Sequence, residues 1–130
     1  MKIIITFGTF DLLHIGHIRI LQKAKSIGDK LIVGISSDKF NFEKKNKYPI
    51  YNENERCEII KSIKYVDEVF IEENFELKKE YIKKYKADIL VMGSDWDGKF
   101  DYLKELCEIK IFDRTENIST SDIIKKIKEC

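Results

Sequence analysis

Short runs of apolar residues alternate along the chain with segments whose apolar residues recur every three or four positions. Runs of four or five apolar residues, many of them β-branched, are typical of strands buried on both faces. Such runs predict strands over residues 3–7, 31–35, 68–71, 89–92 and 109–112. Helical spacing predicts helices over residues 18–27, 52–63, 75–85 and 119–128. Gly28 is expected to end the first helix from the C′ position, and Asn52 is expected to cap the second.

This alternation of strands and helices predicts a parallel sheet with right-handed crossovers and helices on both faces. We therefore expect one α/β domain over residues 1–130, a Rossmann-like three-layer sandwich around a central parallel five-stranded sheet. Ligands of such sheets bind outside the carboxyl ends of the strands. The lysine-rich segment 38–48 has little periodicity and is expected to be a loop with a short helical turn.

Charge and cysteine content narrow the class of partner. The 130 residues include 24 basic and 23 acidic side chains, a net charge of +1. That balance argues against a nonspecific nucleic-acid binder but allows a small anionic ligand. The three cysteines are widely spaced, and no apolar run is long enough for a leader or a membrane span. We expect a cytoplasmic protein with reduced thiols.

Both histidines of the chain fall in the short segment His14-Ile15-Gly16-His17, after the first predicted strand. Their spacing places two imidazoles on one side of a helical turn, where a helix N-terminus also offers free N–H groups to anions. Gly16 lets a bulky anion approach the backbone. The segment predicts a phosphate site with two imidazole donors. A metal site is the alternative, although two histidines without a third soft ligand bind zinc poorly.

Residues 8–17, GTFDLLHIGH, resemble the signature of the HxGH nucleotidyltransferase superfamily, and more narrowly that of bacterial glycerol-3-phosphate cytidylyltransferases. The similarity continues in DKFN at 38–41, YVDEV at 65–69, VMGSDWDGKFD at 91–101 and RTENISTS at 114–121. The HxGH segment combined with the ISTS element before the last helix makes the resemblance specific. It implies transfer of CMP from CTP to sn-glycerol 3-phosphate, without a covalent intermediate. It also implies a homodimer that makes precursors of a cell-wall or capsular polymer.

The resemblance also implies roles for individual residues. It assigns catalysis to side chains that would neutralise the phosphates: His14, His17, Lys44 and Arg114. Lys45 and Lys47 remain alternatives to Lys44. It assigns nucleotide binding to Thr9, Phe10, Asp11, Gly16, Arg56, Asp95, Trp96, Thr115, Ile118, Ser119 and Thr120. Asp95 would accept a hydrogen bond from the exocyclic amine of cytosine, and Trp96 would provide a flat apolar wall.

Several of these positions have plainer interpretations. Asp11 is a candidate ligand of Mg²⁺, the expected cofactor, or else a partner of the helix N-terminus. Arg56 is a CTP contact or an ordinary surface arginine. Lys64, where the family usually has arginine, and Lys78 are candidate acceptor contacts, although Lys78 lies on a helical face that is most simply solvated. Asn117 stands where the family usually has glycine and can keep the loop's shape at positive φ.

Three other functions stay open at the level of sequence. The same chemistry could serve another phosphomonoester, such as phosphoethanolamine or phosphocholine, or another nucleoside triphosphate. A nucleotide-binding regulator without turnover is less favoured, because both histidines, Arg114 and the ISTS element are present. Class I aminoacyl-tRNA synthetases share the HIGH segment, but this chain has neither a KMSKS-type loop nor an RNA-binding region.

Overall fold

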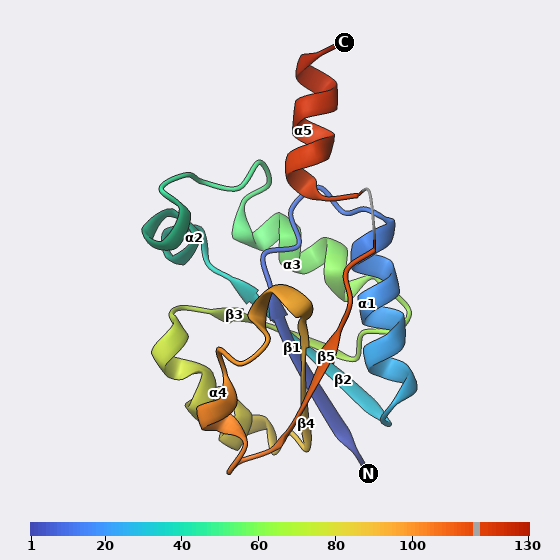
Figure 1. The fold of residues 1–130 in the computed structure, drawn as a ribbon, viewed down its shortest axis with the longest axis vertical. Helices are drawn as coiled ribbons and strands as arrows, with labels where there is room; N and C mark the ends of the chain where they lie inside the picture. The colour runs from blue at the N-terminus through green and yellow to red at the C-terminus, as the bar shows by residue number, and fades with distance from the viewer. Residues whose placement is uncertain (116–117) are drawn as a thin grey trace.

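A parallel sheet forms the centre of the molecule (Figure 1). The computed structural model describes residues 1–115 and 118–130, and within them the strands are β1 (Ile3–Gly8), β2 (Lys30–Ser36), β3 (Glu68–Glu72), β4 (Ile89–Gly93) and β5 (Glu108–Phe112). They pair in the order β3-β2-β1-β4-β5, and every pairing is parallel. The predicted five-stranded parallel sheet is confirmed, with each strand within two residues of its expected limits.

Helices connect the strands and extend the chain beyond the last one. The α-helices are α1 (Ile15–Ser26), α2 (Asp38–Lys45), α3 (Glu53–Lys61), α4 (Lys78–Tyr85) and α5 (Thr120–Lys128). Short 3₁₀ turns are η1 (Phe75–Leu77), η2 (Ser94–Trp96) and η3 (Asp101–Leu103). Asn52 caps α3 as predicted, because its side chain accepts a hydrogen bond from the backbone N–H of Glu55.

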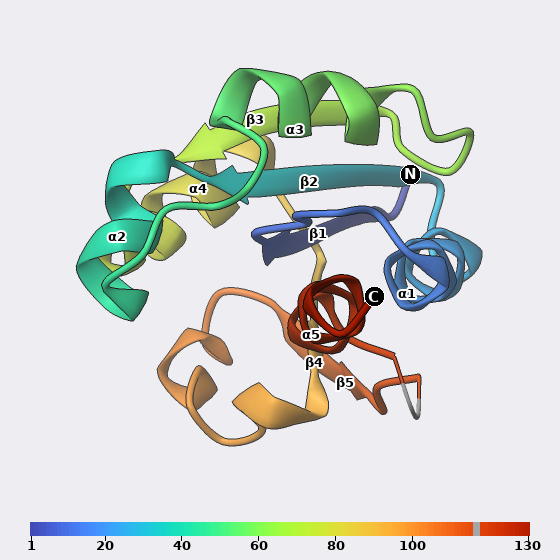
Figure 2. The ribbon, with the colours of Figure 1, turned by 90° about the horizontal axis from the view of Figure 1, so that it is seen from above.

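Two hydrophobic cores lie on the two faces of the sheet. On one face, Leu21 and Ala24 of α1 and Ile60 of α3 pack against Ile4 and its neighbours. The other face carries a core that includes Ile82 of α4 and side chains from the segment between β4 and β5. Figure 2 shows α3 and α4 at different levels around the sheet. The arrangement confirms the predicted three-layer sandwich.

The segment 38–48 was expected to be a loop with a short helical turn, and the structure contains more helix than that. Residues Asp38–Lys45 form α2, which begins where the side chain of Ser37 accepts a hydrogen bond from the N–H of Phe40. It ends at Asn46, whose backbone is left-handed. Phe40 and Asn41 are the buried residues of α2. Only two inward-facing positions in eight residues give too weak a period to recognise in a lysine-rich sequence.

Gly28 follows α1 as predicted, but its role is not the expected one. Among the glycines, all of which lie in the described part of the chain, only Gly98 has a positive φ. A Cβ atom on Gly28 would instead lie 2.5 Å from Cγ1 of Ile4. The residue is glycine because the chain passes directly against β1 there.

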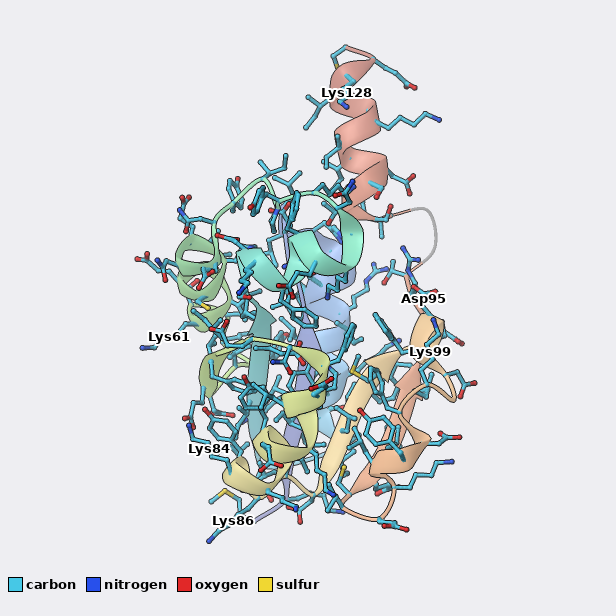
Figure 3. The ribbon with its side chains drawn as sticks, turned by 90° about the vertical axis from the view of Figure 1, so that its left-hand side faces the viewer. Lys61, Lys84, Lys86, Asp95, Lys99 and Lys128 are labelled. Atoms are coloured by element: carbon cyan, nitrogen blue, oxygen red, sulfur yellow. The ribbon has the colours of Figure 1, made fainter. Side chains whose placement is uncertain are left out.

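The last helix and the surface lysines complete the picture. In Figure 1, α5 projects from the end of the molecule opposite the N-terminus. Figure 3 shows Lys61, Lys84 and Lys86 extending away from the ribbon, as expected of lysines that cover helices. Within the described residues, no helix combines the length and the apolar composition that crossing a membrane requires.

Candidate active site

One pocket of about 470 Å³ opens at the carboxyl ends of the strands, where the topology predicts a ligand site. We call the part formed by residues 9–11, 14, 16, 17, 114, 115 and 118–120 the histidine end. The part formed by Lys44, Glu72, Phe75 and Lys78 is the lysine end. The first carries residues at the start of α1 and the second a residue of α2. These helices lie on opposite sides of β1 in Figures 1 and 2.

The two histidines form a closed unit at the start of α1. His14 is the N-cap of the helix, and its Nδ1 accepts a hydrogen bond of 3.0 Å from the N–H of Gly16. The N–H of His14 in turn donates to Nδ1 of His17 at 3.2 Å. The rings stack with centroids 3.7 Å apart. A Cβ on Gly16 would lie 2.8 Å from Cε1 of His14, so the glycine makes room for the imidazole itself.

These contacts decide which nitrogen of each ring carries the proton. Both Nδ1 atoms accept hydrogen bonds, so in the neutral form each proton must lie on Nε2. Burial, with the charge of Arg114 second, lowers the pKa of His14. Burial, with His14 second, lowers the pKa of His17 to about 4. At neutral pH the pocket therefore contains two uncharged imidazoles of fixed tautomer, which are hydrogen-bond donors for an anion.

The loop between β1 and α1 is held by its own polar groups. Both oxygens of the buried Asp11 carboxylate accept backbone hydrogen bonds, from Ile50 at 2.7 Å and Tyr51 at 3.0 Å. The hydroxyl of Thr120 donates to the carbonyl of Asp11 at 2.7 Å, which ties α5 to the same loop. Phe10 has a left-handed backbone, with φ of 53°. Asp11 thus fixes the segment that follows α2, a role that neither sequence interpretation anticipated.

A metal ion finds no preformed protein site in this arrangement. Within residues 1–115 and 118–130, no group of three or more histidine, cysteine, aspartate or glutamate side chains could hold an ion. The predicted ligand, Asp11, has both carboxylate oxygens engaged by backbone N–H groups. The residues therefore do not fit a resident Mg²⁺ site built on Asp11. Among the described residues, the stacked histidines belong to no group of three possible ligands, which disfavours the metal alternative for them.

Arg56 lies beneath the loop and not in the pocket. Its side chain is fully buried and forms an ion pair with Asp38 at 2.7 Å. The same guanidinium donates to three backbone carbonyls, those of Thr9 at 2.9 Å, Ser36 at 2.8 Å and Tyr51 at 3.0 Å. Both sequence interpretations, a CTP contact and a surface arginine, are therefore corrected. The guanidinium of Arg56 bonds three carbonyls and one carboxylate at once, one more partner than the three donors of a lysine allow.

The opposite wall of the pocket comes from the segments after β4 and β5. Arg114 and Asp95, both more than half exposed, form an ion pair of 3.1 Å. Trp96 is half-buried and stacks on Phe100, with centroids 5.4 Å apart. Its indole lines the pocket as a flat wall, as expected. Ser119 caps α5 by accepting a hydrogen bond from the N–H of Asp122.

The structure brings most of the predicted nucleotide-binding residues into this wall and the adjoining loop. The pocket lining includes Thr9, Phe10, Asp11, Gly16, Asp95, Trp96, Thr115, Ile118, Ser119 and Thr120. Asn117 lies outside the described residues. Lys64 is exposed, near the start of β3, with its amino group 5.1 Å from the Tyr65 ring centroid, and it does not line the pocket. The predicted acceptor contact from Lys64 is therefore not available within one chain.

The lysine end contains a buried ion pair. Lys78 and Glu72 form a salt bridge, and the side chains of both are only 2% exposed. The helical face that carries Lys78 was expected to be solvated, which is wrong at this position. Burial raises the pKa of Glu72 and lowers that of Lys78, and each partner opposes the shift of the other. Glu72 was missed by sequence reasoning, although its place directly after the predicted third strand could have signalled it.

Lys44 completes the lysine end. Its amino group lies 4.5 Å from the ring centroid of Phe40 and 5.4 Å from that of Phe75. Burial, followed by the charge of Lys45, lowers the pKa of Lys44 to about 8. Lys45 and Lys47 also line the pocket but are exposed. Of these three lysines, Lys44 has its amino group against the rings of Phe40 and Phe75.

Comparisons with known proteins identify the family of the chain. The family model described as cytidylyltransferase-like matches residues 5–126. The chain belongs to the cytidylyltransferase-like family. Glycerol-3-phosphate cytidylyltransferase of Bacillus subtilis (strain 168) is 52% identical over 128 residues, which covers 98% of each chain. The enzyme of the same name from Staphylococcus aureus (strain NCTC 8325 / PS 47) is 45% identical over 127 residues, covering 98% of this chain and 96% of the relative.

A solved structure shares the fold of this chain. The lipopolysaccharide core biosynthesis protein from Thermoplasma volcanium GSS1 superposes with a TM-score of 0.75 at 27% identity. The match covers 91% of this chain and 99% of that one. The resemblance stated from the HxGH and ISTS segments is therefore confirmed at the level of family and fold.

Proposed function

We propose that this cytidylyltransferase-like protein transfers CMP from CTP to sn-glycerol 3-phosphate, giving CDP-glycerol and pyrophosphate. The names of the relatives from Bacillus subtilis and Staphylococcus aureus support this choice of nucleotide and acceptor. The observation that carries the chemistry is the pair of neutral imidazoles at the histidine end. Their Nδ1 atoms are occupied by backbone N–H groups, which leaves two Nε2–H donors for phosphate oxygens.

The reaction is a direct displacement at the α-phosphorus of CTP. An oxygen of the acceptor phosphate forms a bond to this phosphorus as the bond to the bridging oxygen of the β-phosphate breaks. The electron pair of the broken bond leaves on pyrophosphate. Such a reaction needs alignment and charge stabilisation and no protein nucleophile. His14 and His17 donate to the oxygens on which charge accumulates.

CTP and the acceptor bind at different ends of the pocket. The triphosphate lies along the histidine end, with Arg114, Ser119 and Thr120 as further donors. The cytosine lies beside Trp96, where the Asp95 carboxylate accepts from its exocyclic amine. The acceptor lies at the lysine end, with its phosphate towards Lys44 and its other end towards the buried Lys78.

Three further elements belong to the proposal. Mg²⁺ accompanies CTP as an ion held by its phosphate oxygens, a mode typical of this metal. The active form is a homodimer. The protein works in the cytoplasm, where free cysteines such as Cys57, Cys107 and Cys130 remain reduced.

The test is a matrix of the four nucleoside triphosphates against a panel of phosphomonoesters, read by release of pyrophosphate in the presence of Mg²⁺. We expect the highest kcat/KM for CTP with sn-glycerol 3-phosphate. A higher value for another nucleotide or acceptor would reject the stated substrates. Tight CTP binding without turnover of any acceptor would instead favour the regulator, and light scattering of the same sample reports the homodimer.

A further inference from the structure

The lysine end of the pocket has the composition of a cation-binding site. The amino group of Lys78 lies 4.1 Å from the ring centroid of Phe7, 5.0 Å from that of Phe75 and 5.2 Å from that of Phe100. It also pairs with the buried carboxylate of Glu72. Aromatic faces around an ammonium group are the usual means by which proteins recognise quaternary ammonium ligands. Here the chain's own lysine occupies that position.

Few carboxylates remain for any other cation in this pocket. In the described part of the chain, the carboxylates that line it are Asp11, Glu72, Asp95 and Asp113. Asp11 accepts two backbone hydrogen bonds, Glu72 pairs with Lys78, and Asp95 pairs with Arg114. Asp113 is exposed, and it follows β5, away from the lysine end. A cationic group at the lysine end would therefore meet Lys44 and Lys78 without a free carboxylate.

The position of Lys78 is costly to maintain, which argues against an incidental contact. Both members of its ion pair are withdrawn from water, and the desolvation of two buried charges can exceed their attraction. Lysine is among the residues least often fully buried, yet Lys78 is 1% exposed beside the pocket. Lys79, the next residue of α4, is exposed as usual.

We propose that Lys78, held by Glu72 among the three rings, determines which acceptor the enzyme uses. This inference rests on the proposed function. By filling the cation site, Lys78 excludes phosphomonoesters whose other end is an ammonium group. It leaves room only for acceptors whose other end is neutral and hydroxylated. Glu72 acts through Lys78 and is a positioning residue.

The experiment compares acceptor preference in the wild type and in Lys78→Ala, with Lys79→Ala as the matched control on the same helix. For each, kcat/KM is measured at saturating CTP with sn-glycerol 3-phosphate, phosphoethanolamine and phosphocholine. In the wild type we expect glycerol 3-phosphate to exceed phosphocholine by at least about 100-fold. In Lys78→Ala we expect the ratio to fall by at least about tenfold, because rings and carboxylate become free for a cation. Lys79→Ala should keep the wild-type ratio.

A second variant and a second readout guard against loss of folding. Lys78→Ala leaves Glu72 buried without its partner, so Glu72→Gln with Lys78→Ala removes both charges and restores a neutral site. Thermal unfolding checks that each variant is folded. Choline chloride should then inhibit the folded variants competitively against glycerol 3-phosphate and leave the wild type unaffected.

Two results would overturn the inference. One is a wild type that uses phosphocholine nearly as well as glycerol 3-phosphate. The other is a folded variant whose acceptor ratio and choline sensitivity match those of the wild type. The proposed function fails separately, if the wild type does not use glycerol 3-phosphate with CTP at all. A wild type active on glycerol 3-phosphate whose ratio does not respond to Lys78 rejects the specificity role alone.

Discussion

The two ends of the pocket attract phosphate by different means. The histidine end uses uncharged donors, two imidazoles whose Nδ1 atoms are bonded within one turn of helix. The lysine end uses a cation, Lys44, held against aromatic rings beside the buried pair of Lys78 and Glu72. Neutral donors of fixed direction suit the transition state, because their strength does not depend on pH near neutrality. A partly buried cation suits the binding of a doubly charged acceptor, but its charge depends on pH, because burial lowers the pKa of Lys44 to about 8.

The largest expected effect concerns the support beneath the histidine end. Arg56→Met leaves the carbonyls of Thr9, Ser36 and Tyr51 without their donor and Asp38 without its ion-pair partner. Removing one member of a buried pair typically costs about 3–5 kcal/mol, and we expect a loss of that size in the free energy of unfolding, measured by urea denaturation. Lys61→Met, an exposed site on the same helix, should change stability by less than about 0.5 kcal/mol. Equal effects of the two substitutions would show that Arg56 does not stabilise the fold.

The next prediction separates the chemical roles of the two ends. His17→Ala removes a donor to the leaving group and should lower kcat by about 10²–10³-fold, with a modest change in KM. Lys44→Met removes a ground-state contact to the acceptor phosphate and should act mainly on KM for glycerol 3-phosphate. Steady-state kinetics at saturating CTP distinguishes the two patterns. A reversal, with His17 acting on KM and Lys44 on kcat, would contradict the assigned division.

The third prediction uses the different titration of the two ends. The protonated form of Lys44 binds phosphate, and its pKa of about 8 means that this charge is lost as the pH rises through that value. We expect kcat/KM for glycerol 3-phosphate to decline above about pH 8, with the loss in KM. Lys44→Arg keeps its charge throughout this range and should move the decline to higher pH. An unchanged profile in Lys44→Arg would assign the titration to another group.

The smallest effect concerns stability in acid. The pKa of His17 is about 4 in the folded protein and 6.5 when the imidazole is exposed in the unfolded chain. Between these values the unfolded chain binds the extra proton. Folding stability should therefore be full above about pH 6.5 and fall as the pH drops towards 4, because burial disfavours the charged imidazolium in the folded protein. The melting temperature of the wild type should follow this trend, and that of His17→Gln should follow it less steeply. Parallel curves for the two proteins would show that His17 does not contribute.

The fold followed from the sequence wherever local pattern and tertiary packing agree. Buried strands read as apolar runs because both faces of a parallel sheet are covered, as in Leu31–Ile35 of β2. The helix α2 was missed because two inward-facing residues, Phe40 and Asn41, do not make a visible period. Lys78 was placed on a solvated face because periodicity distinguishes the faces of a helix but does not show how deeply the rest of the chain buries each face.

Local sequence was also enough to predict one part of the candidate site and not another. His14, Gly16 and His17 lie within one helical turn, so their spacing in the sequence already fixes their mutual geometry. Residue type and motif led to the prediction that this turn binds an anion. The contacts of Arg56, Asp11 and Glu72 depended on partners up to 109 residues away, and no local pattern specifies such partners.

The sequence by itself determined the strand order along the chain, the helix that starts at the histidines and the family to which the chain belongs. Tertiary structure alone decided the contacts of three side chains. Arg56 donates to the carbonyl of Thr9 in the loop after β1, and Asp11 accepts from backbone N–H groups and is not an open metal ligand. Lys78 lies buried with Glu72. The physical reason is range. Periodicity, capping and motif spacing act over a few residues, whereas the burial of a charge is set by every segment that packs around it.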